Sequence, residues 1–254
     1  MTKTSWESVG VWYQNLVGEE GHYYHRTTIM PGVLRLMDLK PGGKEKVLDL
    51  ACGQGIAARC LPPKLVYTGV DAAASLIKFA QKNALPSHEF ILSDVTKPLK
   101  LPQKDYTHAL IVLALQNMEH PQVAIQNAAK HLAPGGKLIL ILNHPCFRIP
   151  RQSSWGIDEA KHLQYRRTDS YLSQMKIPIQ MSPGKGQESS TTWSFHYPLA
   201  DLITWMVQAG FRVDAMEEWA SDKKSTGRMA KMENRARAEI PLFMAIRGRI
   251  PDNT

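Results

Sequence analysis

The sequence has few cysteines, no long apolar run and no hydrophobic start. Three cysteines in 254 residues are too few for a disulfide scaffold and favour a reducing compartment. The longest apolar run, Ala109 to Leu115, has seven residues, whereas a membrane-spanning helix needs about 18. The opening MTKTSWES lacks the apolar segment of a secretory signal peptide. We therefore expect a cytoplasmic protein without a membrane span.

Charge and composition further restrict the class of protein and the partners to be expected. The 31 basic and 23 acidic side chains give a net charge of +8, and 43% of the residues are hydrophobic, which is typical of a globular core. The densest basic stretch, Ser221 to Ala238, contains no aromatic residue, although grooves for single-stranded nucleic acid usually do. We interpret it as a solvated loop and expect RNA to be a less favoured partner than a small molecule. No Cys/His spacing resembles a zinc site, so no metal is expected.

Short apolar runs alternate with helical patterns, which predicts a doubly wound α/β sheet covered by helices. The expected strands are 46–50, 65–70, 90–93, 107–115 and 138–142. The helices expected between them are 56–61, 74–83 and 123–132. After a helix at 198–208, two further strands at 211–219 and 241–247 complete seven strands and are expected to pair antiparallel.

Two segments do not fit this alternation. Residues 1–45 are expected to form a helical N-terminal cover, with one helix at 6–17 and another capped by Thr28. Residues 146–197 are polar, aromatic and rich in turn residues. A structureless loop of that length is improbable, and an insertion after the last βα unit belongs above the carboxyl ends of the strands. We expect a single domain, 1–254, with residues 146–197 as a substrate lid.

The strongest motif is a strand, turn and helix in VLDLACGQGIAARCL, residues 47–61. Gly53 and Gly55 allow the backbone to approach a ligand closely, and the following helix offers free N–H groups. Asp71 ends the second strand, where a carboxylate can accept both hydroxyls of a ribose. Asp94 ends the third strand and can accept from an adenine amine, while the backbone N–H of Val95 donates. Together these strand ends predict an adenosine-containing ligand.

The residues alone leave two such ligands open. Gly53-x-Gly55-x-x-Ala58 also fits a dinucleotide fingerprint, in which glycines approach a pyrophosphate, so an NAD-dependent oxidoreductase stays an alternative. Asp49 would repel a pyrophosphate, but its charge suits a ligand that carries an ammonium and a sulfonium group.

The sequence resembles the class I S-adenosylmethionine (SAM) methyltransferases, particularly the small-molecule branch that includes quinone-biosynthesis enzymes. VLDLACGQG resembles the first motif of this family, GVDAA its ribose-binding strand end, LSDV its adenine-binding strand end and HLAPGGKLIL the turn before strand five. The resemblance implies a Rossmann-like methyltransferase fold. It also implies a set of cofactor-binding residues: Asp49, Gly53, Gly55, Asp71, Asp94, Val95 and the backbone of Leu113, with Tyr13, Tyr24 and His25 contributed by the cover.

A general base is needed only for some acceptors. The candidates are His144, which follows strand five, and His25 in the cover; His22 and His196 are weaker ones. A nucleophilic Cys146 is disfavoured because the companion Pro-Cys of RNA cytosine methyltransferases is absent from strand four.

We therefore expect methyl transfer from SAM to a small-molecule acceptor, with release of S-adenosylhomocysteine (SAH). An RNA methyltransferase and a SAM-binding module without catalysis are the alternatives. The acceptor atom, the pathway and the oligomeric state stay open.

Overall fold

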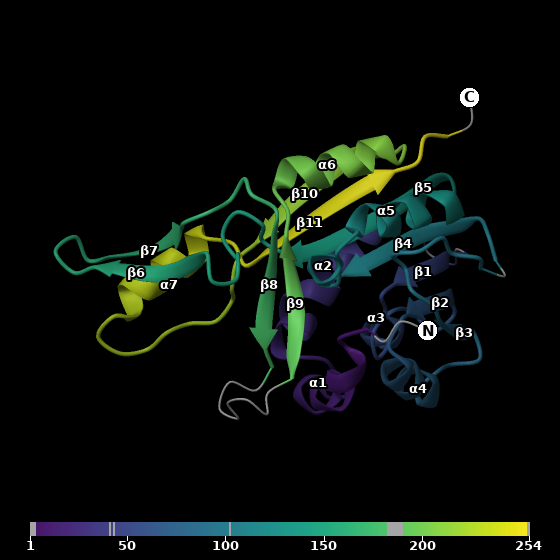
Figure 1. The fold of residues 1–254 in the computed structure, drawn as a ribbon, viewed down its shortest axis with the longest axis horizontal. Helices are drawn as coiled ribbons and strands as arrows, with labels where there is room; N and C mark the ends of the chain where they lie inside the picture. Colours follow the sequence, from purple (N-terminus) through teal and green to yellow (C-terminus); the bar gives the residue numbers. More distant parts are fainter. Residues whose placement is uncertain (1–3, 41, 43, 102, 182–189, 253–254) are drawn as a thin grey trace.

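A seven-stranded sheet organises the chain in the computed structural model, which describes residues 4–40, 42, 44–101, 103–181 and 190–252. The strand order is β10-β11-β5-β4-β1-β2-β3 (Figure 1). Its strands are β1 (Lys46–Leu50), β2 (Val66–Asp71), β3 (His88–Leu92), β4 (Tyr106–Val112), β5 (Leu132–Asn143), β10 (Arg212–Trp219) and β11 (Phe243–Arg249). The first five run parallel, whereas β11 is antiparallel to both β5 and β10. The predicted doubly wound, seven-stranded sheet is confirmed.

Helices cover both faces of this sheet, which explains why the central strands read as continuous apolar runs. The helices are α1 (Gly10–Val17), α2 (Met30–Met37), α3 (Ile56–Cys60), α4 (Ala74–Lys82), α5 (Pro121–His131), α6 (Leu199–Gln208) and α7 (Ala230–Glu239). Buried side chains of α5 and α6 pack in one core cluster, and those of α2 and α3 pack in a second one. The two clusters hold the sheet between two helical layers, and its carboxyl edge stays free for a site.

Two local predictions were wrong. Thr28 does not cap a helix, because it lies within the π-helical turn η2 (His25–Ile29), which runs without a break into α2. The basic stretch predicted as a loop includes all but the last residue of helix α7, which runs from Ala230 to Glu239. Only one side chain of α7, Ala236, is buried, so this helix has almost no apolar stripe in its sequence to reveal it.

The 146–197 segment folds into two antiparallel hairpins. One joins β6 (Ser153–Asp158) to β7 (Leu163–Thr168), and the other joins β8 (Met175–Gln180) to β9 (Thr191–His196). The β8–β9 hairpin crosses the carboxyl edge of the sheet toward α1, whereas β6, β7 and α7 project to the side (Figure 1). The segment thus carries short elements of its own, as its length predicts. The division of the chain into one domain, a cover and a lid stays a prediction.

A close contact between α2 and β10 gives a test of the packing. A methyl group added at Gly32 would collide with the indole of Trp219. Alanine is favoured over glycine in a helix by about 1 kcal/mol, but overpacking costs about 1–3 kcal/mol. We expect Gly32→Ala to lower the free energy of unfolding in urea, and Trp219→Leu to remove most of that loss in the double variant. An unchanged or raised stability of Gly32→Ala would contradict this packing.

Candidate functional site

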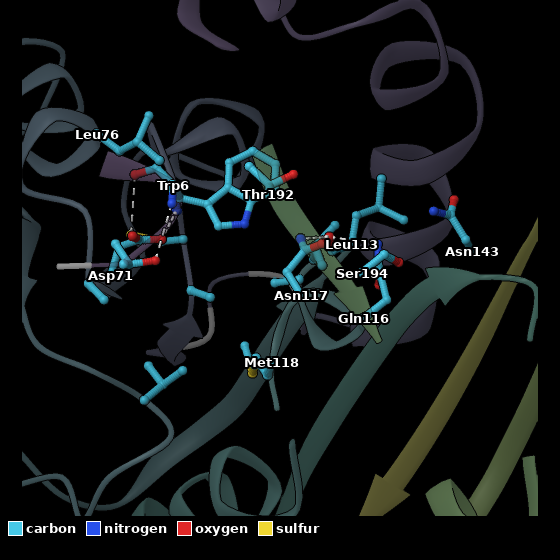
Figure 2. A pocket seen from close by; sticks show the side chains of 18 of the residues that line it. Trp6, Asp71, Leu76, Leu113, Gln116, Asn117, Met118, Asn143, Thr192 and Ser194 are labelled. Carbon is cyan, nitrogen blue, oxygen red and sulfur yellow. Dashed lines mark hydrogen bonds between the residues drawn. The ribbon is translucent and has the colours of Figure 1, made fainter. Parts of the chain in front are cut away.

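One large cavity, of about 910 Å³, lies at the carboxyl edge of the sheet. Its wall combines residues of the N-terminal segment, the turns after β1, β2, β3 and β4, and the β8–β9 hairpin. Figure 2 shows Asp71 and Leu76 at one end of the view and Asn143 at the other, with Thr192 and Ser194 of β9 between them. Ligand sites usually have about 300–1,000 Å³, so this cavity has room for a cofactor and a second small molecule.

The glycine turn and the end of β2 are tied together by the Asp71 carboxylate. Its Oδ2 accepts a hydrogen bond from the N–H of Gly53 at 2.8 Å, and its Oδ1 accepts from the N–H of Ala73 at 2.8 Å. Gly53 has a φ of +55° and lines the cavity with Asp71. The carboxylate is therefore held by backbone donors at the cavity wall, with acceptor capacity left for a ribose.

Gly55 has a different part in the same turn. Its φ is +79°, and an added Cβ would lie 3.2 Å from the Phe90 ring and 3.3 Å from Ala80. Gly55 does not line the cavity. Its backbone lets α3 begin tightly against its neighbours, so its contribution to a ligand site is indirect.

Asp49 is a buried carboxylate with one free oxygen. Its side chain lines the cavity although the residue is only 1% exposed. Oδ2 accepts a hydrogen bond from Tyr67 at 2.6 Å, while the buried Oδ1 has no partner among the described residues. Burial raises the pKa of Asp49 to about 7, against the lowering effect of the Tyr67 hydrogen bond. A ligand that carries positive charge would compensate this carboxylate, and a pyrophosphate would not.

The ends of β3 and β4 complete this part of the wall. Asp94, Val95 and Leu113 all line the cavity. The Asp94 carboxylate accepts hydrogen bonds from the N–H and the hydroxyl of Thr96 at 2.9 and 2.6 Å, which fix its orientation. The carbonyl of Leu113 accepts from the side-chain amide of Gln116 at 2.9 Å. The predicted strand-end residues therefore meet at one cavity.

Of the remaining predicted site residues, some line the cavity and others do not. Tyr24 and His25 line the cavity. His144 does not, because its ring is buried behind the end of β5: Nε2 lies 2.6 Å from Glu218 and Nδ1 accepts from the N–H of Cys146 at 3.2 Å. The backbone of Tyr13 is in α1, and its side chain lies outside the described part of the structure.

Sequence reasoning missed most of the wall opposite the strand ends. These residues come from the segment after β4, the end of β5 and the second hairpin: Gln116, Asn117, Met118, Asn143, Lys176, Thr192 and Ser194. Polar and aromatic composition drew attention to the 146–197 segment. The register of the two hairpins decides which of their side chains face inward. A single sequence does not show that register.

Comparison with known proteins identifies the family of the part of the chain that carries these strand ends. Residues 48–140 match the family model described as "Methyltransferase domain". The chain contains a class I SAM-dependent methyltransferase domain. The predicted resemblance is confirmed, and SAM is the cofactor of this class of domain. The residues fit it, because Asp71 offers acceptors for a ribose and Asp49, a buried carboxylate with one unpaired oxygen among the described residues, lines the cavity that would receive the cationic end of SAM.

The relatives of the methyltransferase domain include quinone-biosynthesis enzymes. The ubiquinone biosynthesis O-methyltransferase of Coxiella burnetii is 33% identical over 96 residues, which are 36% of this chain and 41% of that protein. The ubiquinone/menaquinone biosynthesis C-methyltransferase of Syntrophotalea carbinolica is 28% identical over 109 residues, or 41% of this chain and 46% of that protein. The chain therefore spans less than half the length of these curated relatives.

The fold likeness extends over more of the chain. An S-adenosylmethionine-dependent methyltransferase from Mesorhizobium loti superimposes with a TM-score of 0.65 at 22% identity, covering 86% of this chain and 96% of that one. Across the described ranges, no helix has the length and apolar character to cross a membrane. The same residues contain no cluster of three metal-binding side chains.

Because the Asp49 carboxylate is buried, replacing it with a neutral side chain should raise the stability of the ligand-free protein, and the gain should depend on pH. Its pKa rises from 3.8 to about 7 on folding, so the ligand-free protein loses stability as the pH rises through that window. We expect Asp49→Asn to melt higher than the wild type at pH 8, by about 2–4 °C for each kcal/mol regained, and by a smaller margin at pH 5, where less of the 3.8-to-7 window has been crossed. The affinity for SAH should fall at the same time.

Asp94→Asn is the matched control for this melting experiment. Burial raises the pKa of Asp94, but its bonds to Thr96 and Lys97 outweigh burial and leave the pKa below the ordinary value. Asp94→Asn should therefore gain no stability at pH 8. Equal melting temperatures of Asp49→Asn and the wild type at pH 8 would refute the buried charge.

Proposed function

We propose that this protein transfers the methyl group of SAM to a small-molecule acceptor and releases SAH. The observation that carries the proposal is the continuity of one cavity, which extends from the carboxylates at the ends of β1, β2 and β3 to the inward face of the β8–β9 hairpin. In the reaction the bond from sulfur to the methyl carbon breaks as the bond from the acceptor to that carbon forms. The sulfonium thereby becomes a neutral thioether.

The protein contributes alignment and exclusion of water. The inner wall of the hairpin brings Thr192, Ser194 and Phe195 against the cavity, and all three are buried. The ammonium of Lys176 lies 5.1 Å from the centre of the Trp193 ring and 3.1 Å from Glu119, which closes the rim between the hairpin and the segment after β4. An acceptor held under this rim would be kept near the methyl group and away from water.

The proposal assigns a general base, where the acceptor needs one, to His25. His25 lines the cavity, and its Nδ1 is buried without a hydrogen-bond partner among the described residues. Burial and the neighbouring His22 lower the pKa of His25 to about 4, so the ring is neutral at pH 7 and has a nitrogen free to accept, but it is a weak base in the ligand-free protein. His144 is the poorer candidate because both of its ring nitrogens already have protein partners. Its bonds position the turn after β5.

Calorimetric titration with SAM, SAH and NAD tests the cofactor before any acceptor is known. We expect micromolar binding of SAM and SAH and none of NAD. Asp71→Ala should weaken SAH by at least tenfold, because each charge-assisted hydrogen bond to the ribose is worth about 1.5–3 kcal/mol. Binding of NAD alone would overturn the proposal, and unchanged SAH affinity in Asp71→Ala would overturn the ribose assignment.

The acceptor class and the base are tested by SAH release from SAM. A screen of small phenols, amines, thiols and carboxylic acids should yield turnover, with none on transcribed RNA. Turnover on RNA alone would favour the RNA alternative, and SAM binding without any turnover would favour the binding module. With a hydroxyl acceptor, His25→Ala should lower kcat by about 10²–10⁴-fold and leave SAH affinity unchanged. His144→Ala should retain more activity, and the reverse order would move the base to His144.

A further inference from the structure

Arg148 carries a half-buried positive charge that the described part of the chain does not neutralise. Its Nε is buried and has no hydrogen-bond partner there. Its guanidinium lies over the ring of Trp155, 5.3 Å from the ring centre, and Arg166 lies 5.4 Å from the same centre. Burial first, and then the charge of Arg166, lower the pKa of Arg148 to about 10, so it is still charged at pH 7. Two cations thus share one indole ring.

The two arginines differ in how they are held. Arg166 donates to the carbonyl of Phe147 at 2.8 Å and to the hydroxyl of Ser153 at 2.8 Å, so its guanidinium has acceptors within the protein. Among the described residues no carboxylate forms an ion pair with Arg148 or Arg166, and none contributes to the pKa of either group. Buried charges in proteins are normally paired. Arg148 therefore has the environment of a cation whose partner is not among the described residues.

Arg148 borders a small recess directly behind the proposed acceptor end of the cavity. The recess has a volume of about 40 Å³. Five residues line both it and the large cavity: Gln116, Asn143, Pro150, Ser194 and Phe195. Figure 2 shows Gln116, Asn143 and Ser194 gathered at the end of the cavity away from Asp71. A group in the recess can therefore belong to a molecule whose other end lies in the cavity.

The size and the lining of the recess indicate which chemical group would fit in it. A water-sized occupant needs about 10–15 Å³, so the recess accommodates about three heavy atoms, as in a carboxylate. The planar guanidinium fork matches the two oxygens of a carboxylate. The amide of Asn143 and the hydroxyl of Ser194 add neutral donors at the entrance, while Leu142, Pro145 and Leu202 make the back wall apolar.

We infer that the methyl acceptor carries a carboxylate, which Arg148 binds in this recess while the remainder of the molecule extends toward the cofactor end of the cavity. The inference rests on the proposed function and narrows it to acidic acceptors. Arg148 is a specificity-determining residue in this arrangement, because it contacts a part of the acceptor that does not react.

Matched acids and amides test this inference. Benzoate and 4-hydroxybenzoate would each be titrated beside the corresponding amide into the full chain with saturating SAH at low salt. In the wild type we expect each acid to bind at least tenfold more tightly than its amide. Arg148→Gln should reduce that ratio to about one, and Arg148→Lys should keep part of it, because an ammonium retains the charge but loses the fork.

Arg167→Gln is the matched control. Arg167 lies on the same hairpin next to Arg166, but it is exposed and already paired with Asp169 at 2.6 Å, so its loss should leave the ratio unchanged. The affinity for SAH should be the same in all four proteins, which separates this inference from the cofactor assignment. Should Arg148→Gln fail to fold, a ratio in Arg148→Lys at least threefold below that of the wild type supports the inference.

Two results would overturn the inference while the proposed function stands: normal SAH binding with no preference for acids over amides, or an undiminished preference in the folded Arg148 variants. Failure of the wild type to bind SAH would instead overturn the proposed function.

Discussion

The burial of the Asp49 carboxylate is the constraint on which the rest of the site depends. A charge at the end of a central strand, with only Tyr67 bonded to it, destabilises the ligand-free fold unless it is protonated. The surrounding architecture tolerates this cost because β1 is paired on both sides and packed on both faces. The same placement makes the carboxylate available, in a medium of low dielectric, to a cationic ligand. The buried Asp49 carboxylate therefore lowers the stability of the ligand-free fold and at the same time favours binding of a cationic ligand.

Parallel pairing of the strands places Asp49 next to the other residues of the cofactor site. Because β1, β2, β3 and β4 run in the same direction, their carboxyl ends meet at one edge, and the acidic strand ends in chain order become neighbours in space. Asp71 then locks the glycine turn by accepting from Gly53. The cofactor end of the cavity is thus rigid and made of backbone and short side chains. The acceptor end includes the β8–β9 hairpin, whose strands do not pair with the sheet.

The two ends of the cavity differ in the sign of the charges that border them. The cofactor end presents carboxylates and suits the positive charge of a sulfonium and an ammonium. The proposed acceptor end is bordered by Arg148, whose charge has no partner among the described residues, and by Lys176, which pairs with Glu119. A cavity with opposite charge at its two ends would orient two different molecules toward each other, and it disfavours entry of each in the place of the other.

The sequence by itself determined the seven strands, their order of appearance and the cofactor motif, because buried parallel strands and glycine turns leave local patterns of apolar runs, Gly53 and strand-end aspartates. It did not reveal α7, whose exposed surface has almost no apolar stripe, or the uninterrupted turn at Thr28. Only the tertiary structure decided that His25 borders the cavity while His144 is bonded behind it. It also decided which side chains of the hairpins face inward, and it placed Arg148 beside Trp155. Those relations join residues far apart in the chain. For the hairpins, a one-residue change in strand register would exchange the inward-facing and outward-facing side chains without changing composition or local propensity.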